Sequence, residues 1–206
     1  MNGLLMKNGG KYMERNSHNS QGYKVESQLR EAFGRVVYTQ TCHNKIAERL
    51  SKRDNNIKIL QIVLSAMTTG GFITTIICDE TIVKIIGAII SFFLLIFNSY
   101  TKNFNLIEKA ESHKNAANLL WKIREEYVSI LIDFDMLELN EIVAIRDDLQ
   151  NRTFELYNNY PRTDRKSYLQ AQKSLKTEEE QTFSEKEIDV MLPNSIRREN
   201  RKFNDK

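Results

Sequence analysis

The chain of 206 residues has few of the side chains from which catalytic and metal sites are usually built. It contains three histidines, two cysteines and one tryptophan. Neither a glycine-rich phosphate-binding loop nor a nucleophile elbow occurs in it. Because no catalytic constellation can be assembled from the residues present, we expect no enzymatic activity, no cofactor and no metal site.

Proline and glycine are also scarce, at two and eight residues respectively. Segments that alternate apolar and polar residues are nearly absent as well, which argues against strands and favours long helices. Charge of one sign is not in excess: the net charge is +3, and basic residues are interleaved with acidic ones. A nucleic-acid partner is therefore not expected.

Two long apolar runs lie in the middle of the chain, although the mean hydropathy of −0.48 conceals them. From Ile59 to Cys78 every residue except Gln61 is apolar, small or hydroxylic. About 20 helical residues, rising roughly 1.5 Å each, span a hydrocarbon core of about 30 Å. A second run, Thr81 to Phe97, follows directly after Asp79 and Glu80. We expect a two-pass transmembrane hairpin; a hairpin buried inside a soluble bundle is the alternative.

Lys84 interrupts the second run near its start. A central lysine costs about 3 kcal/mol on insertion, but the twelve Leu, Ile, Phe and Val residues of this run contribute roughly −0.3 to −0.6 kcal/mol each. Lys84 also lies within one turn of the acidic tip, so its ammonium can reach the headgroups. The lysine is therefore compatible with a membrane span.

The charges that flank the hairpin predict its orientation. Basic residues cluster before the first run and after the second, whereas the tip is acidic, so both termini should be cytoplasmic in a bacterial inner membrane. The basic residues are Arg35, Lys45, Arg49, Lys52, Arg53, Lys58, Lys102, Lys109 and Lys114. This topology separates Cys42 from Cys78 across the membrane and argues against a disulfide.

Each span carries one polar face. At 100° per residue, one stripe follows the first span and a second follows the other, with Leu94 interrupting it. The stripes either pack the two helices together or, in a homo-oligomer, line a pathway that Phe72 constricts. The residues are Gln61, Ser65, Thr68, Phe72 and Thr75 in the first span, and Lys84, Gly87, Ser91 and Asn98 in the second.

Two apolar seams predict cytosolic helices that pack side by side. No proline or glycine follows the second span, so one continuous helix from about Thr81 to Asp133 is the simplest prediction. Its seam consists of Leu106, Ala110, His113, Ala117, Leu120, Arg124, Tyr127, Leu131 and Phe134. The seam before the hairpin consists of Val25, Leu29, Ala32, Val36, Thr39, His43, Ile46 and Leu50.

In an antiparallel packing His43 and His113 lie roughly 20 Å from the membrane and could face each other. Such a pair either fixes the register of the helices or acts as a metal or pH site. Arg124 needs a partner, for which Glu125, Glu126 or an acid of another helix is available. Trp121 is expected in the core.

Two further helices are expected. One follows Asp135 and ends near Asn158, and the other begins at the N-cap Asp164 and runs through Leu175. The segment after Thr177 is expected to be an irregular tail or a docking segment. The predicted organisation is a disordered tail (1–22), an amphipathic helix (23–55), the hairpin (56–101), a cytosolic helical region (102–176) and a charged segment (177–206). The fold class is all-α, a membrane hairpin whose helices extend into a cytosolic bundle.

Four segments resemble bacterial SLATT proteins, the SMODS and SLOG-associating two-transmembrane effectors. They are AFGRVVYTQTCHNKIAERL, EKAESHKNAANLLWKIREEYVSILIDF, NNYPRT and MLPNSIRREN, within roughly residues 25 to 200. The second segment looks like the branch found alone or beside reverse transcriptases. The matching positions, which look structural in the family, are Ala110, His113, Ala117, Trp121, Arg124, Glu125 and Tyr127.

The resemblance implies a role in antiphage conflict systems. There, a sensor protein or nucleotide signal triggers the effector, and the infected cell loses membrane integrity. The expected partners are therefore the lipid bilayer, further copies of the chain and a sensor or nucleotide signal. A membrane-anchored scaffold that binds a partner through its cytosolic helices, without pore activity, is the alternative.

Overall fold

The protein is built from helices alone over the part of the chain that the structure describes. The computed structural model describes the backbone of residues 3–77 and 81–198 and the side chains of residues 21–73, 81–194 and 196–198. In chain order the elements are α1 (Gly3–Ile77), α2 (Thr81–Phe104), α3 (Leu106–Ile132), a 3-10 turn (Phe134–Met136), α4 (Leu139–Asn159), α5 (Arg165–Lys176), α6 (Glu185–Met191) and a second 3-10 turn (Asn194–Ile196). The all-α prediction is confirmed.

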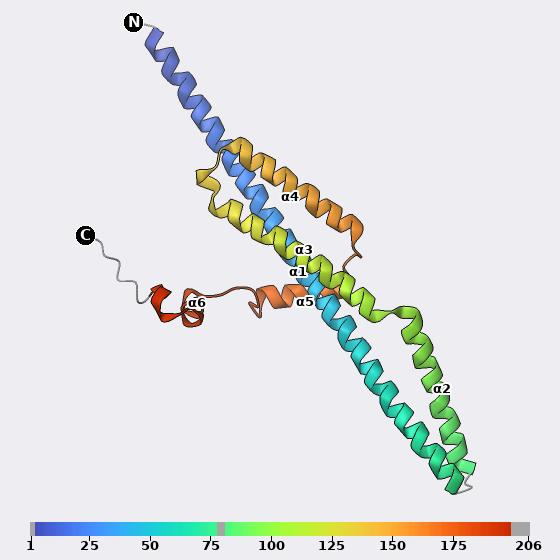
Figure 1. Cartoon of the computed structure of the whole chain (residues 1–206). Helices are drawn as coiled ribbons and strands as arrows, with labels where there is room; N and C mark the ends of the chain where they lie inside the picture. The colour runs from blue at the N-terminus through green and yellow to red at the C-terminus, as the bar shows by residue number, and fades with distance from the viewer. Residues whose placement is uncertain (1–2, 78–80, 199–206) are drawn as a thin grey trace.

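Helix α1 runs through most of the length of the molecule (Figure 1). At 1.5 Å per residue its 75 residues extend roughly 110 Å. It passes the predicted boundary at residues 55 and 56 without interruption, although Asp54, Asn55 and Asn56 lie there, because no proline removes a backbone hydrogen bond. It also begins at Gly3, where the sequence predicts a disordered tail over residues 1–22; extending an existing helix by further turns is far easier than nucleating one.

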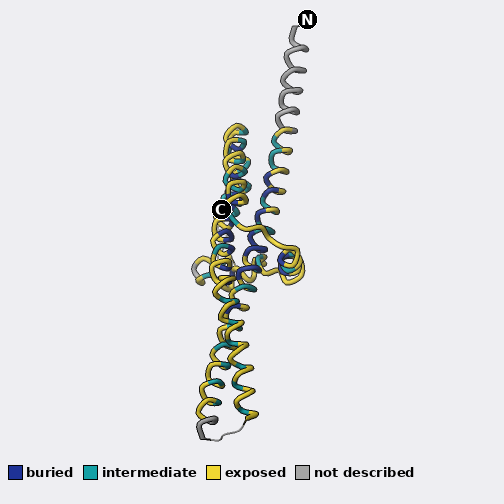
Figure 2. Tube along the Cα trace, turned by 90° about the vertical axis from the view of Figure 1, so that its right-hand side faces the viewer, coloured by how far each residue is buried: buried dark blue, intermediate teal, exposed yellow. Residues whose placement is uncertain are grey.

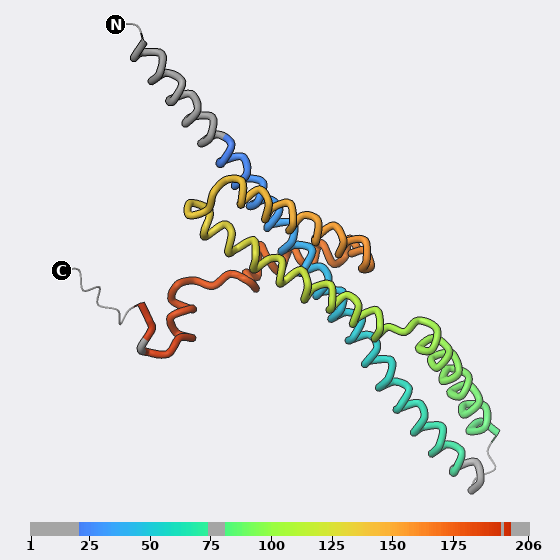
Figure 3. The backbone as a smooth tube through the Cα atoms, turned by 45° about the horizontal axis from the view of Figure 1, so that its top comes forward, coloured from blue at the N-terminus to red at the C-terminus, as the bar shows by residue number. Residues whose placement is uncertain are grey.

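The predicted hairpin consists of the second half of α1 and of α2, which lie side by side in Figures 1 and 3. Both helices are long and apolar enough to cross a membrane, and none of their most apolar stretch is buried inside the protein. Figure 2 shows the described residues of this part as exposed or intermediate, and none as buried. The alternative of a hairpin buried in a soluble bundle is therefore wrong, since no other element that the structure describes covers it.

The prediction of one continuous helix from Thr81 to Asp133 is wrong. Asn105 separates α2 from α3, with φ of 23° and ψ of 65°, outside the helical region. Its side chain accepts a hydrogen bond from the Glu108 amide at 3.3 Å and so caps the new helix. Asparagine tolerates positive φ better than most residues, so a helix can end here without proline or glycine.

Helices α1 and α3 form the core of the bundle and are antiparallel. Residues 32 to 43 of α1 meet residues 127 to 113 of α3 in reverse order. Most of both predicted seams is buried at this contact, which confirms the seams as packing faces. The core cluster also takes in α4 and comprises Leu29, Ala32, Val36, Ala116, Leu120, Ile123, Tyr127, Ile130, Ile142, Leu149 and Leu156.

The helices that follow complete this bundle. Helix α4 ends one residue from its predicted end, and Asp164 caps α5 as predicted, with its carboxylate accepting from the Ser167 amide at 2.7 Å. The prediction that the segment after Thr177 is irregular is wrong in part. Ser184 and Glu187 form a capping box that starts the short helix α6.

Two adjacent leucines of α3 test the assignment of the core. Leu120 is fully buried, whereas Leu119 is 45 % exposed. Leu120→Ala should lower the free energy of unfolding by about 2–5 kcal/mol because it leaves a cavity in the core. Leu119→Ala should cost less than about 1 kcal/mol. Chemical denaturation in detergent measures both, and equal losses would contradict the assignment.

The break at Asn105 is tested by two substitutions. Asn105→Ala should destabilise the protein by about 1 kcal/mol, because alanine neither caps α3 nor tolerates positive φ. Asn105→Gly should cost only a few tenths, since glycine adopts this conformation freely. Thermal unfolding followed by circular dichroism compares the two variants. A glycine variant less stable than the alanine variant would rule out the positive φ.

Candidate functional site: the hairpin faces and the buried histidine pair

A polar contact joins the two spans near the end of the hairpin that faces the bundle. The Gln61 amide nitrogen donates a hydrogen bond of 2.9 Å to the Asn98 side-chain oxygen, and Thr101 Oγ1 lies 3.5 Å from the same nitrogen. Both partners belong to α2. Gln61 and Asn98, each predicted on a polar face, are thus brought together in one contact between the helices.

The two polar faces do not meet as whole stripes. The α1 residues that are half-buried along α2 are Ile57, Gln61, Leu64, Thr68 and Gly71, and their counterparts in α2 are Val83, Gly87, Ile90, Leu94 and Phe97. Among the predicted stripe residues, Ser65, Phe72, Lys84 and Ser91 are exposed. The side chain of Thr75 lies outside the described residues.

The difference has a simple geometric cause. At 100° per residue, the contact face of α1 is about as wide as the stripe drawn from the sequence, but it is rotated from that stripe by roughly 40° about the helix axis. Ser65 and Phe72 lie on the side of the stripe that this rotation turns away from α2. Phe72 is 66 % exposed and does not constrict anything within one hairpin.

The hydroxyl groups of the spans bond within their own helices. Thr68 donates to the Leu64 carbonyl at 2.9 Å, Thr69 to Ser65 at 3.0 Å and Ser91 to Gly87 at 2.9 Å. A Cβ placed at Gly71 or Gly87 would meet no atom within 4 Å. Close packing through small residues is therefore not what holds the two spans together.

The predicted encounter of His43 and His113 is confirmed. The two Nδ1 atoms lie 2.9 Å apart and the ring centroids 4.9 Å apart, with both residues buried between α1 and α3. At that distance one Nδ1 carries the shared proton and donates it to the other. The pair therefore sets the register of the two helices.

Burial and proximity keep the two imidazoles neutral. Burial, and then the neighbouring His113, lower the pKa of His43 to about 4. Burial also lowers the pKa of His113, while the Asp164 carboxylate opposes this shift and the Arg49 guanidinium adds to it. Asp164 and Arg49 pair with each other at 2.5 Å, so α5 is anchored to α1 beside the histidines.

Of the remaining seam residues, Tyr127 is fully buried, and Arg124 pairs with Glu125, one of its expected partners, as well as with an unexpected residue. Arg124 Nη1 donates to the Gln181 amide oxygen, and its Nε lies 4.0 Å from the Glu125 carboxylate. Its hydrogen-bonding partner is thus a neutral residue of the C-terminal segment. Trp121 is 53 % exposed, so the prediction that it belongs to the core is wrong. It lies one position past Leu120, about 100° further round α3, and so points away from the core.

Sequence reasoning missed the contacts through which the C-terminal segment binds α1. Lys45 pairs with Glu180 at 2.8 Å, and Gln181 donates to Thr41 at 3.0 Å. The residues are separated by more than 130 positions, so no local pattern relates them. Of the two alternatives for the segment after Thr177, a tail or a docking segment, the contacts of Glu180 and Gln181 with α1 favour docking.

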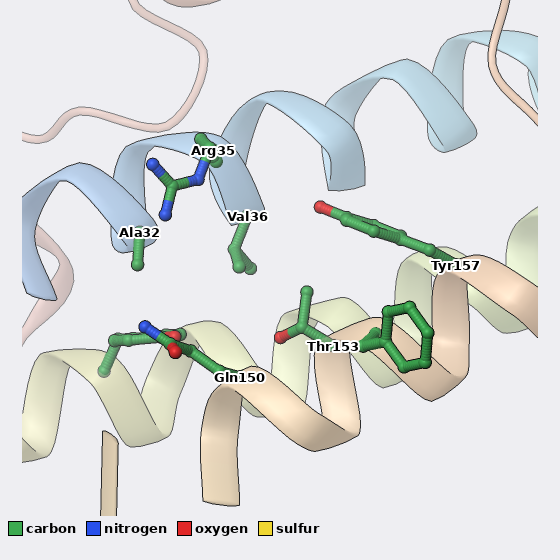
Figure 4. Close-up of a pocket in the computed structure, with 8 residues that line it drawn as sticks. Ala32, Arg35, Val36, Gln150, Thr153 and Tyr157 are labelled. Carbon is green, nitrogen blue, oxygen red and sulfur yellow. The ribbon is translucent and has the colours of Figure 1, made fainter. Parts of the chain in front are cut away.

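A small hollow of about 200 Å³ remains between α1 and α4 (Figure 4). Ala32 and Val36 line it from α1, Thr153 and Tyr157 from α4, and Arg35 lies at its edge. The hydroxyl of Tyr157, which lines the hollow, lies 3.3 Å from Thr39 Oγ1 on α1. Among the residues that the structure describes, no three of the His, Cys, Asp and Glu side chains gather as a metal site.

The histidine pair predicts a dependence of stability on pH. Because the pKa of His43 falls from 6.5 to about 4 on folding, the unfolded chain binds more protons between these values. The contribution of His43 to the free energy of unfolding is fully present above about pH 6.5. It decreases as the pH falls towards 4, by at most about 1.4 kcal/mol per pH unit for one histidine.

His43→Gln and His113→Gln should each flatten this dependence, whatever they do to stability at pH 7. Denaturation in detergent between about pH 3.5 and 7.5, a range that brackets the His43 pKa of 6.5 in the unfolded chain and of about 4 in the folded protein, provides the measurement. An unchanged slope in both variants would show that the pair does not titrate on unfolding.

Comparison with known families identifies the chain. A family model described as SMODS and SLOG-associating 2TM effector domain family 4 matches residues 25–187. The match includes three of the four resembling segments, and MLPNSIRREN lies beyond its end. No curated protein and no solved structure matches.

The matched residues contain the whole hairpin, the histidine pair and helices α3 to α5. The family consists of two-transmembrane effector domains of antiphage conflict systems, in agreement with the two helices found here. The chain belongs to the SMODS and SLOG-associating 2TM effector domain family 4.

Proposed function

We propose that this protein is an oligomeric effector that permeabilises the bacterial inner membrane when its cytosolic helices are rearranged. The trigger would be a sensor protein or a nucleotide signal, and the outcome would be abortive infection. Family membership supports the effector role. The observation that carries the proposal is the set of hydroxylic and aromatic side chains that the hairpin leaves on its outside.

These side chains occupy one outward face of α1. Ser65, Thr69 and Phe72 are spaced four and three residues apart and are all exposed. Two helices cannot enclose a pathway, so only neighbouring copies can bring this face into a lumen. In such an assembly Ser65 and Thr69 would line the pathway, and the Phe72 ring would form its hydrophobic constriction.

The packing of the hairpin supports its capacity to rearrange. Gly71 and Gly87 are half-buried between the spans, yet a side chain at either position would meet open space. The spans are held by the Gln61–Asn98 contact, while their middle is loosely packed. Loose packing lowers the free energy needed to rotate one span against the other.

Helix α1 offers a direct mechanical connection between the trigger and the membrane. It continues from the cytosolic core into the first span without a break, and α5 and Glu180 bind it at Arg49 and Lys45. A partner that displaced these contacts would act on the same rigid helix that carries Ser65 and Thr69. Cytoplasmic termini follow from the basic residues at this end of the hairpin.

Leakage from vesicles tests the proposal. Ser65→Leu/Thr69→Leu should reduce dye release at least tenfold, because leucine replaces the hydroxyls that would hydrate the pathway. As a control, Ile62→Leu/Ile73→Leu changes exposed apolar positions of the same helix and should leave release unchanged. Chemical cross-linking reports the oligomer in both variants.

The scaffold alternative is distinguished by replacing the hairpin. If an unrelated two-pass anchor preserved the cellular effect, the membrane spans would serve only as an anchor. Unchanged leakage from a cross-linked Ser65→Leu/Thr69→Leu oligomer would likewise overturn the proposed pathway.

A further inference from the structure

The end of the hairpin that adjoins the bundle carries a surface hollow of about 360 Å³ on α1. Its six lining residues recur at helical spacing and form one face that runs from charged to apolar. They are Arg49, Lys52, Arg53, Asn56, Ile57 and Leu60. Three cations and an amide therefore lie directly above the first apolar side chains of the membrane span.

Only one of the three cations of this hollow is paired with an acid in the described part of the chain. Arg49 is paired with Asp164, and Asp54, the nearest acid in sequence, is buried and paired with Lys58 at 2.7 Å. No ion pair joins Lys52 or Arg53 to another residue in the described part of the chain. Two exposed positive charges thus remain at the predicted level of the headgroups.

Aromatic rings hold the second of these charges in place. The Arg53 guanidinium carbon lies 5.5 Å from the Tyr100 ring centroid, and the Tyr100 ring stacks on Phe104 at 4.6 Å. Lys109 Nζ lies 5.8 Å from the Phe104 centroid. Arginine stacked on an aromatic face keeps its edge N–H groups directed outward, where they can donate to phosphate.

We propose that this hollow binds the phosphate of an anionic phospholipid. Arg53 and Lys52 donate to the phosphate oxygens, Asn56 contacts the polar headgroup, and one acyl chain follows Ile57 and Leu60 towards the hydrocarbon core. The gradient from cation to leucine matches the amphipathic structure of a phospholipid, which a free phosphate or a nucleotide lacks. The site rests on the membrane hairpin alone and is independent of pore formation.

Lipid selectivity in reconstituted vesicles tests the site. The full chain in phosphatidylcholine vesicles receives a trace of spin-labelled phosphatidylglycerol or spin-labelled phosphatidylcholine, and electron paramagnetic resonance measures the fraction that the protein immobilises. The wild type should prefer phosphatidylglycerol. Lys52→Gln and Arg53→Gln should each reduce that preference about fivefold, whereas Arg53→Lys should retain most of it.

The matched control is Lys102→Gln. It removes one exposed charge from the last turn of α2, at the end that adjoins the bundle and outside the hollow. It should change the lipid preference less than about twofold, as expected for a solvent-screened charge that does not line the hollow. Equal losses in Lys52→Gln and Lys102→Gln would reduce the effect to general surface potential and overturn the site. Equal immobilisation of both lipids by the wild type would also overturn it.

A competition experiment distinguishes a lipid from a soluble anion. Excess inorganic phosphate is added to the vesicles and compared with chloride at equal ionic strength. Because the proposed site also holds an acyl chain, phosphate should displace no more labelled lipid than chloride does. Selective displacement by phosphate would identify the hollow as a soluble-anion site and contradict the lipid assignment.

Discussion

The hydrocarbon core of the membrane is the constraint on which the rest of this structure depends. A backbone that crosses it must satisfy its hydrogen bonds internally, so both apolar runs are helical over their described length. Since nothing interrupts α1 between the apolar span and the bundle, one helix belongs to both parts of the molecule. Helices α2, α3, α4 and α5 all contact α1.

Helix α1 is packed very differently in the bundle and in the hairpin. In the bundle, Leu29, Leu120 and Tyr127 are completely or almost completely buried, and a bidentate pair between Arg152 and Glu126 joins α4 to α3. In the hairpin, no residue of α2 is buried, and the described polar contacts between the spans lie at the end near the bundle, where Gln61 meets Asn98 and Thr101. The bundle is therefore the well-packed part of the described chain, and the hairpin is the loosely packed part.

Polar contacts concentrate in the layer between these two regions. Within it lie the His43–His113 pair, the Arg49–Asp164 pair and the Arg53–Tyr100 contact. The helical path also bends in this layer, at Asn105. The Arg53–Tyr100 contact and the bend at Asn105 lie beside the membrane spans, whereas the histidine pair lies roughly 20 Å from the spans, further into the bundle.

The sequence by itself determined the elements whose cause is local or periodic. Apolar runs long enough to cross the hydrocarbon core predicted the spans. Heptad-like spacing predicted the seams of α1 and α3 and the contact between His43 and His113. Asp164, a preferred N-cap residue, predicted the start of α5. Only the tertiary structure decided which part of each polar stripe turns inward, because the contact between the helices is rotated about the helix axis from the stripe drawn from the sequence. It also decided the bend at Asn105, the exposure of Trp121 and the binding of Gln181 to Arg124. Each of these depends on residues distant in the chain or on one backbone angle, and no periodicity encodes either.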